Sequence, residues 1–124
     1  MKAFVIDASV VGSDSPLLDE ADVLFAPELI DIEVASLLRK SVLRHERDSD
    51  EAGTILEAWA TNDVMRFAHA PYLDTIWAMR NTITAYDAAY VALAIHLKAA
   101  LLTADRRLAA AAAGYCDVVT VDQA

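Results

Sequence analysis

Cysteine, glycine and histidine are scarce in this chain. Its single cysteine, Cys116, excludes an internal disulfide and is typical of a reducing compartment, so we expect a cytoplasmic protein. Only three glycines are present, and they form no phosphate-cradling loop. The three histidines lack the spacing of metal ligands. Nucleotide binding through a glycine-rich loop and metal chemistry based on His or Cys are therefore not expected.

Long apolar runs are also missing. The most apolar stretch, residues 88–102, is interrupted by His96 and Lys98 and is too short for a membrane span. No signal-peptide pattern precedes the first strand-like segment, so we expect neither export nor membrane insertion. Hydrophobic residues nevertheless make up 56% of the 124 residues, which predicts one packed domain over residues 1–124.

Positive charge is in deficit. The formal net charge is −9, whereas proteins that hold nucleic acid by bulk electrostatics usually carry a basic face. This charge does not exclude a nuclease, because metal-binding carboxylates count as negative although the ion inverts the local charge. The basic residues gather at residues 39–47 and at Arg106 and Arg107, and such clusters are also typical of solvated helix faces.

Strand-like and helix-like segments alternate along the chain. Strands are predicted at residues 2–7, 23–26, 64–68, 100–103 and 117–121. Helices are predicted to begin at Pro27, near Asp48, at Pro71, near Thr84 and at Asp105. Residues 8–22 are predicted to form a loop with a helical turn. The alternation predicts an α/β fold with a mostly parallel sheet flanked by helices.

Two acidic residues come directly after predicted strands. Asp7 ends the first strand-like segment, and Asp105 follows the segment at residues 100–103. Ligands in open α/β sheets gather beyond the carboxyl ends of strands, so both residues are candidates for one site. Each could also be a helix N-cap. Ser9, two residues after Asp7, is expected to cap a turn or to hydrogen-bond Asp7.

Two further acids lie in apolar surroundings. Asp87 stands in the first turn of the most apolar helix, where it could simply complement the helix dipole. Glu33 lies three residues after Ile30 and four before Leu37, so it borders the apolar stripe of its helix. A buried carboxylate needs a partner or a cation, although a glutamate at the margin of a stripe can also reach water.

Together the four carboxylates predict a divalent-cation site. Carboxylates that are packed together repel, and some take up protons unless cations intervene. Mg²⁺ and Mn²⁺ prefer oxygen ligands, and such ions activate water and stabilise displacement at phosphorus. This chemistry requires no His or Cys. The residues alone therefore indicate an acidic, metal-binding pocket.

Four segments carry a more specific pattern. They are residues 5–9 (VIDAS), residues 27–39 (PELIDIEVASLLR), residues 86–94 (YDAAYVALA) and residues 102–108 (LTADRRL). In order and spacing they resemble the PIN-domain family, and most closely its VapC-type toxins from toxin–antitoxin pairs. The resemblance implies a three-layer α/β/α sandwich with a mostly parallel central sheet. It also implies a Mg²⁺- or Mn²⁺-dependent endoribonuclease that arrests translation.

The resemblance also assigns roles to individual positions. The catalytic quartet would be Asp7, Glu33, Asp87 and Asp105, with Asp7 and Asp87 as the principal metal ligands. Thr103 matches a polar position beside the site. We expect the RNA phosphates to be steered by Arg39, Lys40, Arg106 or Arg107. The implied partners are RNA, a cognate antitoxin and a second copy of the chain in a homodimer. The acidic loop at residues 12–22 is less typical of the family.

Three other functions are left open by the residues. A signalling receiver domain shares the length and the alternation, but Ile6 precedes Asp7 where a receiver has a paired acid, and Lys98 precedes its strand. A non-catalytic interaction module could use Leu56, Trp59 and Trp77 as its surface. A DNA nuclease with the same site is disfavoured because the chain has no added arch or clamp segment.

Overall fold

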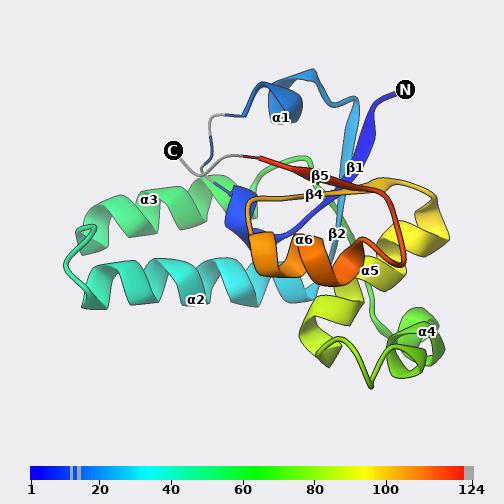
Figure 1. Cartoon of the computed structure of the whole chain (residues 1–124). Helices are drawn as coiled ribbons and strands as arrows, with labels where there is room; N and C mark the ends of the chain where they lie inside the picture. The colour runs from blue at the N-terminus through cyan, green and yellow to red at the C-terminus, as the bar shows by residue number, and fades with distance from the viewer. Residues whose placement is uncertain (12, 14, 122–124) are drawn as a thin grey trace.

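Five short apolar segments form one sheet in the computed structural model, which describes residues 1–11, 13 and 15–121 (Figure 1). The strands are β1 (Ala3–Ile6), β2 (Val23–Pro27), β3 (Met65–Phe67), β4 (Ala100–Thr103) and β5 (Val118–Thr120). They lie in the order β3-β2-β1-β4-β5, and every neighbouring pair is parallel. The predicted α/β fold with a parallel sheet is confirmed.

Helices connect the strands. They are η1 (Ala8–Val10), α1 (Pro16–Glu20), α2 (Leu29–Leu43), α3 (Ser49–Ala60), η2 (Ala70–Tyr72), α4 (Leu73–Ala78), α5 (Ala85–Leu97) and α6 (Arg106–Ala112). The predicted starts of two helices are confirmed, since the N-cap Asp48 accepts from the Glu51 backbone and the N-cap Thr84 accepts from the Asp87 backbone. Gly12 and Asp14 of the predicted acidic loop lie outside the described residues.

Three sequence predictions about these elements were wrong. Pro27 ends β2 and does not open a helix. The backbone pairing of β2 with β3 continues one residue further, where the Glu28 N–H donates to the Phe67 carbonyl at 2.9 Å. Pro71 lies inside the 3-10 helix η2, and α4 begins only at Leu73. Leu37 is 48% exposed, so the apolar stripe of α2 is narrower than its spacing predicted.

The apolar helix α5 lies at the centre of the core. Residues 88–94 are all buried, and the helix packs against β1, β2 and β4. It is covered on nearly every side, which confirms the prediction from its uniformly apolar composition. The polar groups at its first turn are therefore held in place by a packed core.

The strand order reverses beside β1. From β1 the chain moves to β2 and β3 on one side, and then returns to β4 and β5 on the other. In such sheets, ligands bind in the crevice beyond the carboxyl ends of the two strands at the reversal. Asp7 directly follows β1, and Asp105 follows β4 after one residue, with Ile6 and Leu102 paired in register. The topology therefore places both acids at this crevice.

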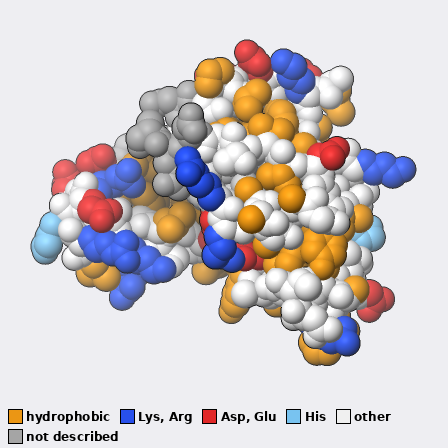
Figure 2. All heavy atoms as spheres, viewed as in Figure 1, with side chains coloured by type: hydrophobic (Ala, Val, Ile, Leu, Met, Phe, Trp, Pro, Cys, Tyr) orange, Lys and Arg blue, Asp and Glu red, His pale blue; other side chains and the backbone are white. Residues whose placement is uncertain are grey.

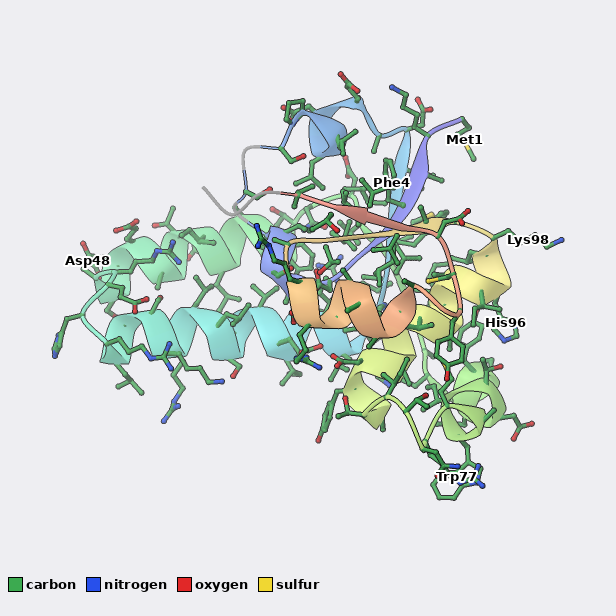
Figure 3. The ribbon with its side chains drawn as sticks, viewed as in Figure 1. Met1, Phe4, Asp48, Trp77, His96 and Lys98 are labelled. Carbon is green, nitrogen blue, oxygen red and sulfur yellow. The ribbon has the colours of Figure 1, made fainter. Side chains whose placement is uncertain are left out.

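Helices α2 and α3 lie side by side and extend away from the sheet as a helical arm, residues 29–60 (Figure 1). Asp48 lies at the outer end of this arm (Figure 3). At the base, Asp31 Oδ1 accepts from Trp59 Nε1 and from Arg66 Nε, both at 2.7 Å. The Arg66 guanidinium also lies 4.8 Å from the centre of the Trp59 ring. This network fixes the base of the arm to β3.

Among the described residues, none of the helices combines the length and the apolarity that spanning a bilayer requires.

The network at the base of the arm gives a first prediction. Asp31→Ala leaves two partly buried donors, on Trp59 and Arg66, without their acceptor, so the free energy of unfolding should fall by about 1–3 kcal/mol. Urea unfolding measures this loss. Glu57→Ala, an exposed change on the same arm, is the control and should have an effect within about 0.5 kcal/mol. Equal stability of the two variants would contradict the anchoring role.

Candidate active site

Asp7 is held by the hydroxyl of Ser9, which in turn contacts the end of β4. Ser9 Oγ donates to Asp7 Oδ1 at 2.7 Å, as the sequence predicted. The same Ser9 oxygen accepts from the Ala104 N–H at 2.9 Å and lies 3.2 Å from Thr103 Oγ1. Because the one Ser9 proton goes to Asp7, Thr103 is the donor in that last contact. Ser9 thus joins the end of β1 to the end of β4.

The carboxyl group of Asp7 is only 7% exposed. Burial raises its pKa from 3.8 to about 6, the hydroxyls of Ser9 and Thr103 lower it, and the charges of Asp105 and Glu33 raise it again. Loss of water and repulsion between like charges therefore outweigh the hydrogen bonds that favour the anion. The site holds more negative charge than its neutral partners stabilise.

Glu33 points from α2 toward α5. The Tyr90 hydroxyl, buried in the core, donates to Glu33 Oε1 at 2.5 Å. Burial raises the pKa of Glu33, the Tyr90 hydrogen bond lowers it, and the charge of Asp87 raises it. Burial and the adjacent Glu33 raise the pKa of Tyr90, which keeps its hydroxyl protonated as a donor. The charges of Asp7 and Asp87 also raise the pKa of Tyr90.

Asp87 and Asp105 lie at the starts of two helices. Asp87 is in the first turn of α5, and its side chain is 15% exposed. Asp105 is the N-cap of α6, where its Oδ1 accepts from the backbone N–H groups of Arg107 (2.9 Å) and Leu108 (3.2 Å). Asp105 therefore caps α6, which was one of its two predicted roles. This cap leaves only Oδ2 available to another partner.

Arg107 bridges these two acids. Its Nη1 donates to Asp87 Oδ2 at 2.7 Å, and its Nη2 lies 3.5 Å from Asp105 Oδ2. The hydrogen bond and the charge of Asp87, followed by the charge of Asp105, raise the pKa of the guanidinium. Sequence reasoning treated Arg107 as a phosphate-steering residue, whereas the structure pairs it with the acids themselves.

The oxygen-rich composition of this site fits a divalent cation. Its donors are carboxylate and hydroxyl oxygens, which Mg²⁺ and Mn²⁺ prefer. Across residues 1–11, 13 and 15–121, no three His, Cys, Asp or Glu side chains stand close enough to enclose a metal ion unaided. Mg²⁺ usually keeps several waters and needs only one or two carboxylates. Burial and the charges of Asp105 and Glu33 raise the pKa of Asp7, and a bound divalent ion would favour its ionised form.

The predicted substrate-binding residues lie in three different environments. Thr103 is fully buried and accepts from the Asp105 N–H at 3.0 Å, so it positions the site from behind and cannot touch RNA. Arg106 lines a cavity of about 670 Å³ together with Ser9 and Asp105. Arg39 lines a separate groove between α2 and α3. Only Arg106 of the three predicted residues therefore borders the crevice with an accessible side chain.

The role of Tyr90 was missed by sequence reasoning. It lies three residues after Asp87 on α5, a spacing that puts two side chains on one helix face. That spacing was the available signal, but the apolar neighbours of Tyr90 made it look like an ordinary core residue.

A parallel sheet in this order, with an acidic crevice at its reversal, defines a PIN-type α/β fold. The crystal structure of PAE2754 from Pyrobaculum aerophilum has the same fold, with a TM-score of 0.73 and 21% identity over 94% of this chain and 83% of that one. The family model of the PIN domain matches residues 5–114, and this chain therefore belongs to the PIN-domain family. The resemblance drawn from its motifs is confirmed.

Several relatives within this family share more of the sequence. Ribonuclease VapC9 of Mycobacterium tuberculosis is 37% identical over 123 residues, which cover 94% of this chain and 97% of that protein. Ribonuclease VapC1 of the same organism is 42% identical over 97 residues, 77% of this chain and 73% of that protein. Ribonuclease VapC3 of Pyrobaculum aerophilum is 36% identical over 96 residues, 74% of this chain and 73% of that protein.

The pKa of Asp7 gives a second prediction. In the unfolded chain this group ionises near 3.8 and in the metal-free folded chain near 6, so the folded state binds more protons between these values. The contribution of Asp7 to stability is therefore most favourable below pH 3.8 and is lost as the pH rises through 6. Asp7→Asn should raise the free energy of unfolding at pH 7 by about 2–3 kcal/mol and much less at pH 4.

Urea unfolding with a chelator present, at pH 7 and pH 4, measures this difference. Asp74→Asn, an exposed change on α4, is the control and should shift neither value by more than about 0.5 kcal/mol. A stability gain of Asp7→Asn that is the same at both pH values would contradict the assigned pKa.

Proposed function

We propose that this chain is a metal-dependent endoribonuclease, the toxin of a toxin–antitoxin pair, which cleaves RNA to arrest translation. The observation that carries the proposal is the acidic crevice at the β1/β4 reversal, in a chain whose relatives are named ribonucleases. Asp7, Glu33, Asp87 and Asp105 are the four acids of this crevice. We assign the activity to one domain formed by residues 1–124.

Mg²⁺ is the proposed cofactor, with Mn²⁺ able to replace it. Asp7 and Asp87 are the proposed ligands, because Asp7 is buried at the end of β1 and Asp87 stands in the first turn of the core helix α5. When bound, the ion supplies activation of water and stabilisation of charge at phosphorus. Asp105 contributes through Oδ2 or through water, since its Oδ1 caps α6.

The remaining residues of the site orient these acids. Ser9 fixes one oxygen of Asp7, and Tyr90 fixes one oxygen of Glu33. Both donors favour the ionised form of the carboxylate that they contact. These hydrogen bonds orient the two carboxylates and partly offset the burial that raises their pKa values.

RNA binding needs positive charge near the crevice, because the chain as a whole is acidic. Arg106 and Arg107 line the cavity beside Asp105, where RNA phosphates would approach. Figure 2 shows Lys and Arg side chains beside Asp and Glu side chains in the hollow next to the helical arm. A cognate antitoxin, a homodimer and a cytoplasmic location complete the proposal and follow from the family relationship.

The alternative functions have less support. The PIN-domain match covers residues 5–114, which favours a nuclease over a signalling receiver. Trp59 cannot form part of the surface of an interaction module, because it is buried at the base of the arm. Trp77 is 68% exposed and projects outward from α4 (Figure 3). The relatives are named ribonucleases, which favours RNA over DNA as the substrate.

The central prediction concerns cleavage. Asp7→Asn and Asp87→Asn should each lower the rate of cleavage of a structured RNA in Mg²⁺ by about 10²–10³-fold, because each removes a charge that the transition state depends on. A gel assay with a labelled RNA measures the rate, with Asp74→Asn as the matched control. Chelation of the metal should abolish cleavage by the wild type. Equal rates in all three variants would overturn the assigned site.

The contact between Tyr90 and Glu33 predicts a change in pH dependence. Tyr90→Phe removes the hydrogen bond that lowers the pKa of Glu33, so the acidic limb of the pH–rate profile should move to higher pH. The control is Tyr115→Phe, which removes a hydroxyl that contacts the hydroxyl of Thr82. A profile that is lowered without this displacement would show that the Tyr90 hydroxyl serves only the packing of the core.

A further inference from the structure

Arg107 occupies a position that ordinary helix electrostatics disfavour. It stands in the first turn of α6, directly after Arg106, where the helix dipole favours acidic residues and opposes cations. Its side chain is 66% exposed, whereas the Asp87 carboxylate that it contacts is 15% exposed. The arginine thus reaches from solvent into the crevice. The acids there offset the unfavourable position of its charge.

The contacts of Arg107 fall on the atoms that a cation would use. Asp87 Oδ2 accepts from Nη1 at 2.7 Å, and Asp105 Oδ2 lies 3.5 Å from Nη2. The other Asp105 oxygen is already committed to the cap of α6. The planar guanidinium therefore engages the free oxygen of Asp105 together with one oxygen of Asp87, and it supplies positive charge to a crevice that has too little.

We propose that Arg107 is an internal counter-cation that competes with the divalent ion for Asp87 and Asp105 and leaves these acids when the ion binds. This inference rests on the proposed function, because it takes Asp87 as a metal ligand. Two cations cannot share the same carboxylate oxygens at hydrogen-bonding distance without strong repulsion. In the metal-free chain Arg107 thus occupies oxygens of Asp87 and Asp105 that the ion would use.

Release of Arg107 requires little rearrangement. The side chain is mostly exposed and its helix remains capped by Asp105 through backbone bonds that do not involve the guanidinium. The cavity of about 670 Å³ beside the site is lined by both Arg106 and Arg107. The released guanidinium therefore stays at the mouth of the crevice, next to a second arginine, where an RNA phosphate would approach.

Metal binding without RNA tests this competition. Isothermal titration of chelator-treated protein with Mn²⁺ should give an affinity about 3–5-fold tighter for Arg107→Met than for the wild type, the range expected for an exposed ion pair. Arg106→Met is the matched control. It removes the same charge from the same helical turn, but within the described residues Arg106 forms no ion pair with the four acids, so its affinity should change by less than about twofold.

A second measurement uses the wild type itself. The guanidinium resonances of Arg107 in NMR spectra should move toward those of a solvated arginine as Mg²⁺ is added, while those of Arg66, which is paired with Asp31, should stay in place. Circular dichroism checks that the Arg106→Met and Arg107→Met variants of the metal titration are folded. This measurement does not depend on the tolerance of the site to substitution.

The outcomes separate the two proposals. If the wild type binds Mn²⁺, Asp87→Asn loses that binding, and Arg107→Met binds no tighter than the wild type, the competition is overturned while the proposed metal site stands. If the wild type binds no divalent ion, both fall. Equal tightening by Arg106→Met and Arg107→Met would also overturn the inference, because it would reduce the effect to overall charge.

Discussion

The repulsion between carboxylates in a poorly hydrated crevice is the constraint on which this site depends. Asp7 shows it most directly, since burial and its acidic neighbours raise its pKa despite two hydroxyl groups that favour the anion. Neighbouring side chains stabilise this negative charge through hydrogen bonds of different kinds. Ser9 and Tyr90 donate neutral hydrogen bonds, and Arg107 donates a charged one. Asp7 and Glu33 each have a hydroxyl donor, whereas Asp87 and Asp105 share the guanidinium of Arg107.

The fold collects these groups from distant parts of the sequence. The starts of α2, α5 and α6 converge near the carboxyl ends of β1 and β4 (Figure 1), and the positive ends of helix dipoles favour the acids that lie there. The buried helix α5 and the anchored base of the helical arm keep Asp87 and Glu33 on rigid elements. Two of the four acids are thus positioned by packed helices, while Asp7 and Asp105 are positioned by the ends of β1 and β4.

Much of this arrangement could be predicted from the sequence. Strand-end positions identified Asp7 and Asp105, and the apolar composition of residues 88–94 identified the central helix. The start of α2 was mispredicted because proline fits the end of an extended segment as well as the first turn of a helix. The contact of Arg107 with Asp87 could not be predicted, since it joins residues 20 positions apart through a tertiary approach. Local periodicity carries no information about such pairs.

One hydrogen bond in the site spans almost the whole chain. The Ala104 N–H donates to Ser9 Oγ across 95 positions, and this bond forms only when β4 has paired with β1. During synthesis the first 100 residues can emerge from the ribosome with Asp7, Glu33 and Asp87 present, yet Thr103, Asp105 and Arg107 are still missing. The crevice is therefore assembled late, after nearly all of the sheet has been translated. The proposed nuclease site therefore stays incomplete until the residues that follow β4 have been added to the chain.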